Sequence, residues 1–216
     1  MSSQHTSAVA PRIVLATHNL KKLAELRAIV AKALPELDPA CIVSAGELGL
    51  HDVVEDGTSF AENALIKARA AAEQSGLIGI ADDSGIAVDI LGGSPGIFSA
   101  RWSGAHGDDA ANNALLLAQL ADIAPEHRGA RFVCAAALVV PGSTAGPSRE
   151  IVEIGEMPGT VLLKEQGSGG FGYDPLFQPK GHTVSAAELT AEEKNAISHR
   201  GTAFRALALH LATLLA

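Results

Sequence analysis

Two adjacent carboxylates, Asp82 and Asp83, follow a short apolar run and are followed directly by Ser84. The pattern predicts strands at about 77–82 and 86–91, joined by a turn that carries these three polar side chains. Carboxylates released at the end of a strand suit phosphate chemistry assisted by Mg²⁺, because this ion takes oxygen ligands and completes its shell with substrate phosphates. The alternative is a solvated turn, since strands that end in two aspartates are common.

Further acids lie close to this pair in the sequence. If the strand continued through the pair, Asp82 and Asp83 would point to opposite faces, so that at most one would face a cleft. Glu62 is expected in a capping box with Ser59, which weakens it as a metal ligand. Glu55 precedes that helix in a loop and is freer to bind a metal. Each acid taken singly is more often solvated than catalytic.

A second polar cluster lies where a predicted strand meets a predicted helix. It consists of Thr17, His18, Asn19, Leu20, Lys21 and Lys22. Free amide N–H groups at a helix start, together with the positive end of the helix dipole, favour a phosphate. The Lys22 ammonium and the Thr17 hydroxyl would add to that attraction. An ordinary capped helix with surface lysines is the alternative, and no G-x-x-x-x-G-K-[ST] loop occurs in the chain.

A glycine-rich segment spans residues 167–175 and satisfies the pattern G-x-G-x-x-G. A dinucleotide site would need a helix directly afterwards, whereas the sequence Tyr-Asp-Pro-Leu-Phe-Gln-Pro cannot start one cleanly. We therefore interpret the segment as a loop whose backbone approaches a ligand, with Phe171 and Tyr173 as stacking faces for a base. A tight turn that packs two aromatic rings is the alternative.

The last polar cluster contains Lys194, His199 and Arg200 within seven residues, at the end of a predicted helix. These side chains would be able to grip a phosphate or a base carbonyl. The alternative is that the cations only interact favourably with a helix C-terminus.

Interleaved helices and strands must position these clusters. Strands are expected at about 12–17, 77–82, 86–91, 131–140 and 150–156, and helices at about 20–33, 60–75, 109–123 and from 202 onward. Capping patterns support the helices: Asn19, Ser59 and Asp108 are predicted N-caps, and Thr190 with Glu193 forms a further capping box. The predicted class is α/β, with a mixed β-sheet, flanking helices and two lobes around a central cleft.

The 216 residues suffice for one large domain or two small lobes. Apolar residues make up 47% and charged residues 19%, as in soluble globular proteins. The formal net charge of −8 argues against binding to nucleic acid, although a local basic cluster can still hold a small anion. We expect residues 1–11 to form a loose tail and residues 12–216 a single domain.

The two cysteines, Cys41 and Cys134, lie in apolar stretches without CxxC spacing, so we expect buried thiols. No apolar run reaches the roughly 18 residues of a membrane span. We therefore expect no membrane partner and a cytoplasmic location.

Together these residues resemble the inosine/xanthosine triphosphate pyrophosphatase family. The resemblance covers nearly the whole chain and includes four motifs in order, which is far more specific than any one of them. They are Thr-His-Asn-Leu-Lys-Lys, then Ser-Phe-Ala-Glu-Asn-Ala with Ala-Asp-Asp-Ser-Gly, then Gly-Gly-Phe-Gly-Tyr-Asp-Pro, and finally Lys-Asn-Ala-Ile-Ser-His-Arg-Gly.

The resemblance implies a homodimer that uses Mg²⁺ to hydrolyse ITP, dITP or XTP to the monophosphate and pyrophosphate. It implies that Asp83 is the general base and that Asp83 and Glu55 are metal ligands. The substrate-binding residues implied by matching position are Thr17, His18, Asn19, Leu20, Lys21, Lys22, Ser84, Phe171, Gly172, Tyr173, Asp174, Lys194, His199 and Arg200. A pyrophosphatase for pyrimidine or other modified nucleotides, and a non-catalytic nucleotide-binding module, are the alternatives.

Overall fold

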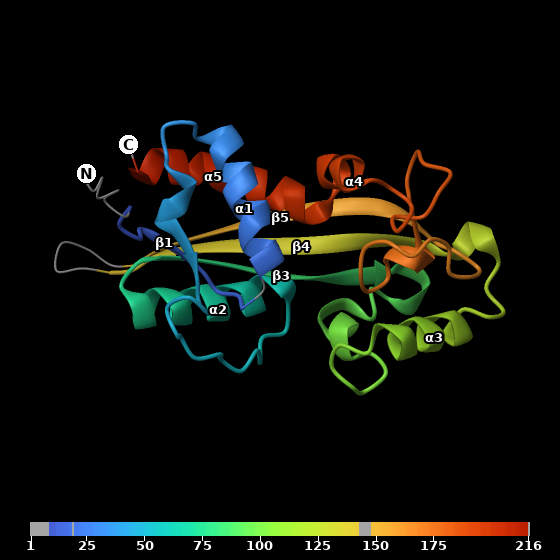
Figure 1. Ribbon diagram of the computed structural model, residues 1–216. Coiled ribbons are helices and arrows are strands. Elements are labelled where there is room, and N and C mark those ends of the chain that lie inside the picture. The colour runs from blue at the N-terminus through green and yellow to red at the C-terminus, as the bar shows by residue number, and fades with distance from the viewer. Residues whose placement is uncertain (1–8, 19, 143–147, 216) are drawn as a thin grey trace, which may run out of the picture.

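The structure is a computed structural model that describes residues 9–18, 20–142 and 148–215 (Figure 1). Most of the predicted N-terminal tail therefore lies outside the described residues. The helices and strands are, in chain order, β1 (Ile13–Leu15), α1 (Leu20–Ala33), β2 (Ile42–Ser44), α2 (Phe60–Ser75), β3 (Ile78–Val88), α3 (Asp109–Gln119), β4 (Gly129–Val140), β5 (Arg149–Val161), β6 (Phe177–Pro179), α4 (Ala191–Ile197) and α5 (His199–Leu215).

The six strands form one sheet in the order β2-β1-β3-β4-β5-β6. Strand β1 is parallel to both β2 and β3, whereas β4, β5 and β6 each run antiparallel to the strand before them. Helices α1 and α5 pack on one face and α2 on the other, as Figure 1 shows. The predicted α/β class with a mixed sheet and flanking helices is therefore confirmed.

The long strands β3, β4 and β5 carry two regions of hydrophobic core. The first lies under α1, α2 and α5 and includes Ile80 and Phe204. The second lies near α3 and β6 and includes Ile86 and Leu116. Since Ile80 and Ile86 belong to the same strand, the polar residues between them lie where the two regions meet. This division corresponds to the two lobes expected from the sequence.

Two glycines let helices approach the sheet closely. A Cβ atom on Gly79 would lie 2.2 Å from the carbonyl oxygen of Ala68 in α2. A Cβ atom on Gly155 in β5 would lie 2.0 Å from the carbonyl oxygen of His199, at the start of α5. Any larger residue would push these helices outward. The close approach at Gly155 brings the first turn of α5 down onto the sheet.

The predicted break between strands at 77–82 and 86–91 is wrong. Strand β3 is continuous, and its residues from Gly79 to Val88 pair in unbroken register with β4. The reason is that the long apolar strand β4 pairs with every residue of the polar stretch. The backbone N–H and C=O groups of that stretch are therefore satisfied within the sheet and do not require a turn. Asp82 and Asp83 therefore stand in the middle of a strand.

The predicted helix caps are mostly confirmed. The Ser59 hydroxyl accepts a hydrogen bond from the Glu62 N–H, and Gly76 ends α2. The Glu62 carboxylate, however, accepts from the N–H and hydroxyl of Thr58, so the reciprocal half of that capping box is absent. Asp108 caps α3, which ends before the predicted residue 123.

The capping box of Thr190 and Glu193 is complete and starts α4. Helix α5 then begins at His199, three residues earlier than predicted. Lys194 and Arg200 therefore lie on two successive helices.

Both cysteines, Cys41 and Cys134, are buried and free, as expected. Within the described residues, every helix is too short or too polar to cross a bilayer.

Candidate functional site

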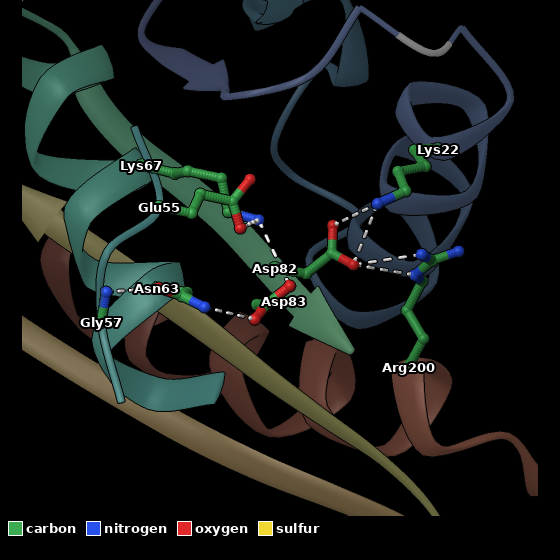
Figure 2. A network of polar contacts seen from close by, with 8 residues as sticks. All are labelled: Lys22, Glu55, Gly57, Asn63, Lys67, Asp82, Asp83 and Arg200. Atoms are coloured by element: carbon green, nitrogen blue, oxygen red, sulfur yellow. Dashed lines mark hydrogen bonds and ion pairs between the residues drawn. The ribbon is translucent and has the colours of Figure 1, made fainter. Parts of the chain in front are cut away.

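Asp82 lies on the α1 and α5 face of the sheet and binds two cations (Figure 2). Lys22 Nζ lies 3.3 and 3.2 Å from the two carboxylate oxygens. Arg200 donates from Nε and Nη2 to Oδ2, at 3.3 and 3.1 Å. Two positive side chains therefore share one carboxylate, which leaves net positive charge for an anion.

The environment of Asp82 keeps it ionised. Burial alone would raise its pKa, because the residue is only 5% exposed. The positive charges of Arg200, Lys22 and Lys67 outweigh that effect and hold the pKa well below its usual range. Asp82 is thus a permanent anion that fixes the position of two cations.

Two helix starts converge at this point. Lys22 belongs to the first turn of α1 and Arg200 to the first turn of α5. Because the N-terminal end of a helix carries partial positive charge, both helices add to the attraction for phosphate. The sequence interpretation placed Arg200 at the end of a helix, and the structure corrects this: it lies at a helix start.

Asp83 points to the opposite face of the sheet, toward α2 (Figure 2). Its Oδ2 atom accepts a hydrogen bond from Asn63 Nδ2 at 3.2 Å, and Lys67 Nζ lies 3.6 Å from its Oδ1 atom. The same Lys67 ammonium lies 3.0 Å from the Glu55 carboxylate. The Asn63 amide also holds the loop before α2, because its oxygen accepts from the Gly57 N–H.

Lys67 and Asn63 were both missed in the sequence analysis. They are four residues apart on α2, so they lie on the same face of that helix. This spacing, read against the acids of the neighbouring strand, is the signal that would have identified them.

The environment of Asp83 raises its pKa. Burial is the largest cause, and the nearby carboxylates of Glu55 and Asp82 act in the same direction. The Lys67 charge and the hydrogen bond from Asn63 oppose the shift without cancelling it. A carboxylate with a raised pKa is a stronger base than an ordinary one, which suits general base catalysis.

The residues around Asp83 fit a magnesium ion in part. The carboxylates of Asp83 and Glu55 both contact the Lys67 ammonium, so they could hold a metal ion between them in the same way. Two carboxylates are what Mg²⁺ takes from a protein when substrate phosphates supply other ligands. Glu62 is held by Thr58 and does not join this set. Among the described residues there is no group of three or more potential ligand side chains, so a full protein cage is absent.

The glycine-rich loop leads into a short 3-10 turn, Asp174–Leu176, and not into an α-helix, which confirms that the dinucleotide pattern is accidental. Phe171 is 64% exposed, and Lys194 Nζ lies 4.9 Å from its ring centroid. The expectation that Tyr173 offers a stacking face is wrong. Its ring is buried, and its hydroxyl donates to the Ser99 carbonyl oxygen at 2.9 Å. Asp174 is buried and forms an ion pair with Lys194.

His199 is half-buried at the start of α5, where its ring stacks on Phe132 at a centroid distance of 5.0 Å. Burial, followed by the charges of Arg200 and Lys194, lowers its pKa to about 3. The imidazole is therefore neutral at physiological pH, with one N–H donor and one nitrogen acceptor. Its Nδ1 atom is buried without a hydrogen-bond partner among the described residues.

The remaining predicted residues lie around the two aspartates. Ser84 is half-buried on the same face of β3 as Asp82. His18 is exposed and paired with Asp52 at 3.0 Å, and Leu20 is also exposed. Thr17 lies in the connection between β1 and α1 and interacts with other residues. Asn19 and the side chain of Lys21 lie outside what the structure describes.

A cavity of about 330 Å³ lies beside the Asp83 network, and its lining includes Glu55, Lys67 and His106. A larger cavity of about 500 Å³ lies at the far end of β4 and β5, next to Arg131 and Lys180. None of the predicted site residues lines the larger one. Among the described residues, Glu55 is the one predicted site residue that lines the smaller cavity, together with its partner Lys67.

The sequence model of the Ham1 family matches residues 13–210. The chain is 58% identical over 196 residues to the dITP/XTP pyrophosphatase of Streptomyces coelicolor, covering 91% of this chain and 94% of that protein.

Two solved structures are also similar. A nucleoside-triphosphatase / dITP/XTP pyrophosphatase of Mycobacterium abscessus has a TM-score of 0.74 at 50% identity, covering 91% of this chain and 98% of the other. A HAM1 protein of Coxiella burnetii has a TM-score of 0.81 at 38% identity, covering 94% of this chain and 99% of the other.

Proposed function

Because this chain belongs to the Ham1 family, we propose that it hydrolyses the non-standard purine nucleoside triphosphates ITP, dITP and XTP to the monophosphate and pyrophosphate. The observation that carries the proposal is the pair of networks on opposite faces of β3. One face holds two cations at helix starts around Asp82, and the other holds a carboxylate, Asp83, whose pKa is raised. The proposal assigns phosphate binding to the Asp82 network and proton transfer to the Asp83 network of the same strand.

The phosphates would bind at Lys22 and Arg200. Their shared partner, Asp82, keeps both side chains in place before substrate arrives, so little entropy is lost on binding. The helix starts add N–H donors for phosphate oxygens. As the anhydride bond between the α- and β-phosphates breaks, these groups would stabilise the negative charge that gathers on the leaving pyrophosphate.

Asp83 would accept the proton of the attacking water. Asn63 orients its carboxylate, and the Lys67 charge opposes the rise of its pKa and so favours the ionised form that accepts a proton. Asp83 and Glu55 would hold Mg²⁺, which when bound supplies positive charge for the phosphate oxygens. Lys67 holds these two carboxylates close to each other.

The base would stack on Phe171, whose ring is exposed and lies next to Lys194. Hypoxanthine and xanthine carry a 6-oxo group that accepts a hydrogen bond, whereas the 6-amino group of adenine does not. A donor placed at this position would therefore discriminate against ATP. The neutral imidazole of His199 and the Lys194 ammonium are candidate donors.

The direct test is pyrophosphate release from ITP, dITP, XTP, GTP and ATP, measured side by side with Mg²⁺ and with a chelator. We expect strong release from the first three, little from the last two, and loss of activity with chelator. Equal release from all five would remove the selectivity, and retained activity with chelator would remove the magnesium requirement. No release from any of them would leave a nucleotide-binding module.

The homodimer, which the resemblance implies, and the cytoplasmic location, which was expected from the lack of a membrane-spanning run, stay predictions. Light scattering during gel filtration checks the oligomeric state.

A further inference from the structure

Helix α3 holds the glycine-rich loop through two side chains that the proposed reaction does not use. Asp109 Oδ2 accepts a hydrogen bond from the Gly172 N–H at 2.7 Å. Asn113 Nδ2 donates to the Gly172 carbonyl oxygen at 3.1 Å and to Glu165 Oε1 at 3.0 Å. Asp109 and Asn113 are four residues apart and therefore lie on the same face of α3. Both peptide groups of Gly172 are thus bound by one helix.

The Asn113 contacts have a defined direction. Its amide faces two acceptors, the Gly172 carbonyl and the Glu165 carboxylate, so only the Nδ2 end can point toward them. The Oδ1 atom is left buried without a hydrogen-bond partner among the described residues. Leaving a buried oxygen unsatisfied is unfavourable, so the two contacts made by Nδ2 must outweigh that cost. Asn113 thus connects Glu165, which precedes the glycine-rich segment, to Gly172 within that segment.

The loop is anchored on its other side as well. The Gly169 N–H donates to the Ala187 carbonyl at 3.1 Å, and the Gln166 N–H donates to the Pro175 carbonyl at 2.9 Å. Neither bond reaches Gly172.

The Phe171 backbone is bound by Asp174, whose carboxylate accepts from the Phe171 N–H at 2.9 Å and whose N–H donates to the Phe171 carbonyl at 3.2 Å. Asp109 and Asn113 add the contacts to the N–H and carbonyl of Gly172, next to the exposed ring of Phe171.

We propose that Asp109 and Asn113 are positioning residues that set the orientation of Phe171 and thereby the base selectivity of the enzyme. The inference rests on the proposed function, because Phe171 is the stacking surface expected there. Among the described residues, Asp109 and Asn113 make no hydrogen bond to the carboxylates of the Asp82 and Asp83 networks. Their loss should therefore act on base binding more than on the chemical step.

The test compares Asp109→Ala with Asp109→Asn in the full-length protein. Asp109 is exposed, so both variants should fold. The alanine removes the acceptor, whereas asparagine keeps an oxygen that can accept from the Gly172 N–H. We expect Asp109→Ala to raise KM for ITP about tenfold and to lower the ITP-to-ATP ratio of kcat/KM about tenfold, with kcat changed less than about threefold. Asp109→Asn should restore most of both values.

Asn113→Ala should resemble Asp109→Ala, and Gln119→Ala is the matched control. Gln119 also lies on α3 and accepts from Trp102 Nε1, but it makes no hydrogen bond to the loop in the described residues. The control should keep the wild-type KM and base preference. Hydrogen exchange of the peptide that contains Gly172 should be faster in the two loop-contact variants and unchanged in the control.

Three outcomes would overturn the inference. Faster exchange with a wild-type KM and base preference would mean that the contacts only stabilise the loop. Equal losses in Asp109→Asn and Asp109→Ala would mean that charge, and not the hydrogen bond, matters. Wild-type protein that releases no pyrophosphate from any triphosphate would remove the proposed function, and this inference with it.

Discussion

The two faces of β3 present the same residue type in opposite states. On one face, Asp82 is buried between Lys22 and Arg200, and its pKa lies well below the usual range. On the other face, Asp83 is partly exposed, has one cation at a longer distance, and its pKa is raised. Adjacent aspartates of one strand thus differ because their neighbours differ.

This difference separates two roles. A carboxylate that never takes up a proton cannot act as a base that cycles through its protonated form at ordinary pH, but it can hold cations in place. A carboxylate with a raised pKa binds and releases a proton closer to neutrality. We therefore assign the positioning of Lys22 and Arg200 to Asp82 and proton transfer to Asp83, and a separate variant tests each assignment.

The largest expected effect is on turnover. Asp83→Asn should lower kcat by about a thousandfold, because general base catalysis contributes roughly 10²–10⁴-fold. Its stability should be unchanged or slightly higher, since the buried charge is removed. Pyrophosphate release from ITP and thermal unfolding measure the two effects. Near-normal turnover in this variant would refute the assigned role of Asp83.

The reverse result is expected for Asp82→Asn. Removing this anion leaves two cations without their shared partner, which should lower the free energy of unfolding by about 3 kcal/mol or more. Urea denaturation measures this loss. Asp89→Asn is the matched control, because Asp89 pairs with Arg131 at an exposed site and should lose less than about 1 kcal/mol. If both variants were equally stable, the anchoring role of Asp82 would be wrong.

Lys67→Met sharpens the contrast on the Asp83 face. The variant removes the cation that opposes the raised pKa of Asp83, so that pKa should rise further. Since the base acts in its ionised form, the rise of kcat/KM with pH should move to higher pH. The loss of activity relative to the wild type should therefore be largest on the acid side of the profile. Arg69→Met, on the same helix and paired with Glu150, should leave the pH profile in place.

The smallest effect is a pH dependence of stability from His199. Its folded-state pKa is about 3, while an unfolded histidine takes up a proton near pH 6.5. The unfolded state therefore binds more protons as the pH falls from about 6.5 toward 3, and the protein loses stability over that window. His199→Phe keeps a ring against Phe132 and removes the titration. Its melting temperature should fall less than that of the wild type between about pH 7.5 and about pH 5.

The contribution of Asp82 falls in a different window. Its folded-state pKa lies below the unfolded value, near 4, so its stabilisation is complete above pH 4 and is lost as the pH falls further through the folded-state pKa. The free energies of unfolding of the wild type and of Asp82→Asn should therefore converge as the pH falls through the folded-state pKa of Asp82, and should differ by the full amount above about pH 4. Curves that ran in parallel at all pH values would contradict the assignment.

Much of the fold followed from local sequence. Helical spacing of apolar residues and the caps at Ser59, Asp108 and Thr190 predicted α2, α3 and α4. The β-branched run before residue 141 predicted β4. These features succeed because capping and side-chain periodicity involve residues a few positions apart.

The errors arose where distant residues decide. A strand was predicted to end at Asp82 because the polar residues after the apolar run were interpreted as a turn. Strand β4 instead pairs with the whole segment, and distant cations neutralise the charge. Tyr173 was expected to face a ligand, yet it packs beside β3 and bonds to Ser99, 74 residues away. Lys67 meets Asp83 only because α2 packs on β3, and the sequence near Lys67 does not show this contact.

The sequence by itself determined that Asp82 and Asp83 would face opposite ways if the strand continued, because side chains alternate along a strand. It also determined which residue types were available for phosphate and for proton transfer. Only the tertiary structure decided which carboxylate meets which cations, since Lys22 lies 60 residues and Arg200 118 residues from Asp82 along the chain. The pKa of each carboxylate depends on those contacts, because burial and neighbouring charge act through space and not along the sequence.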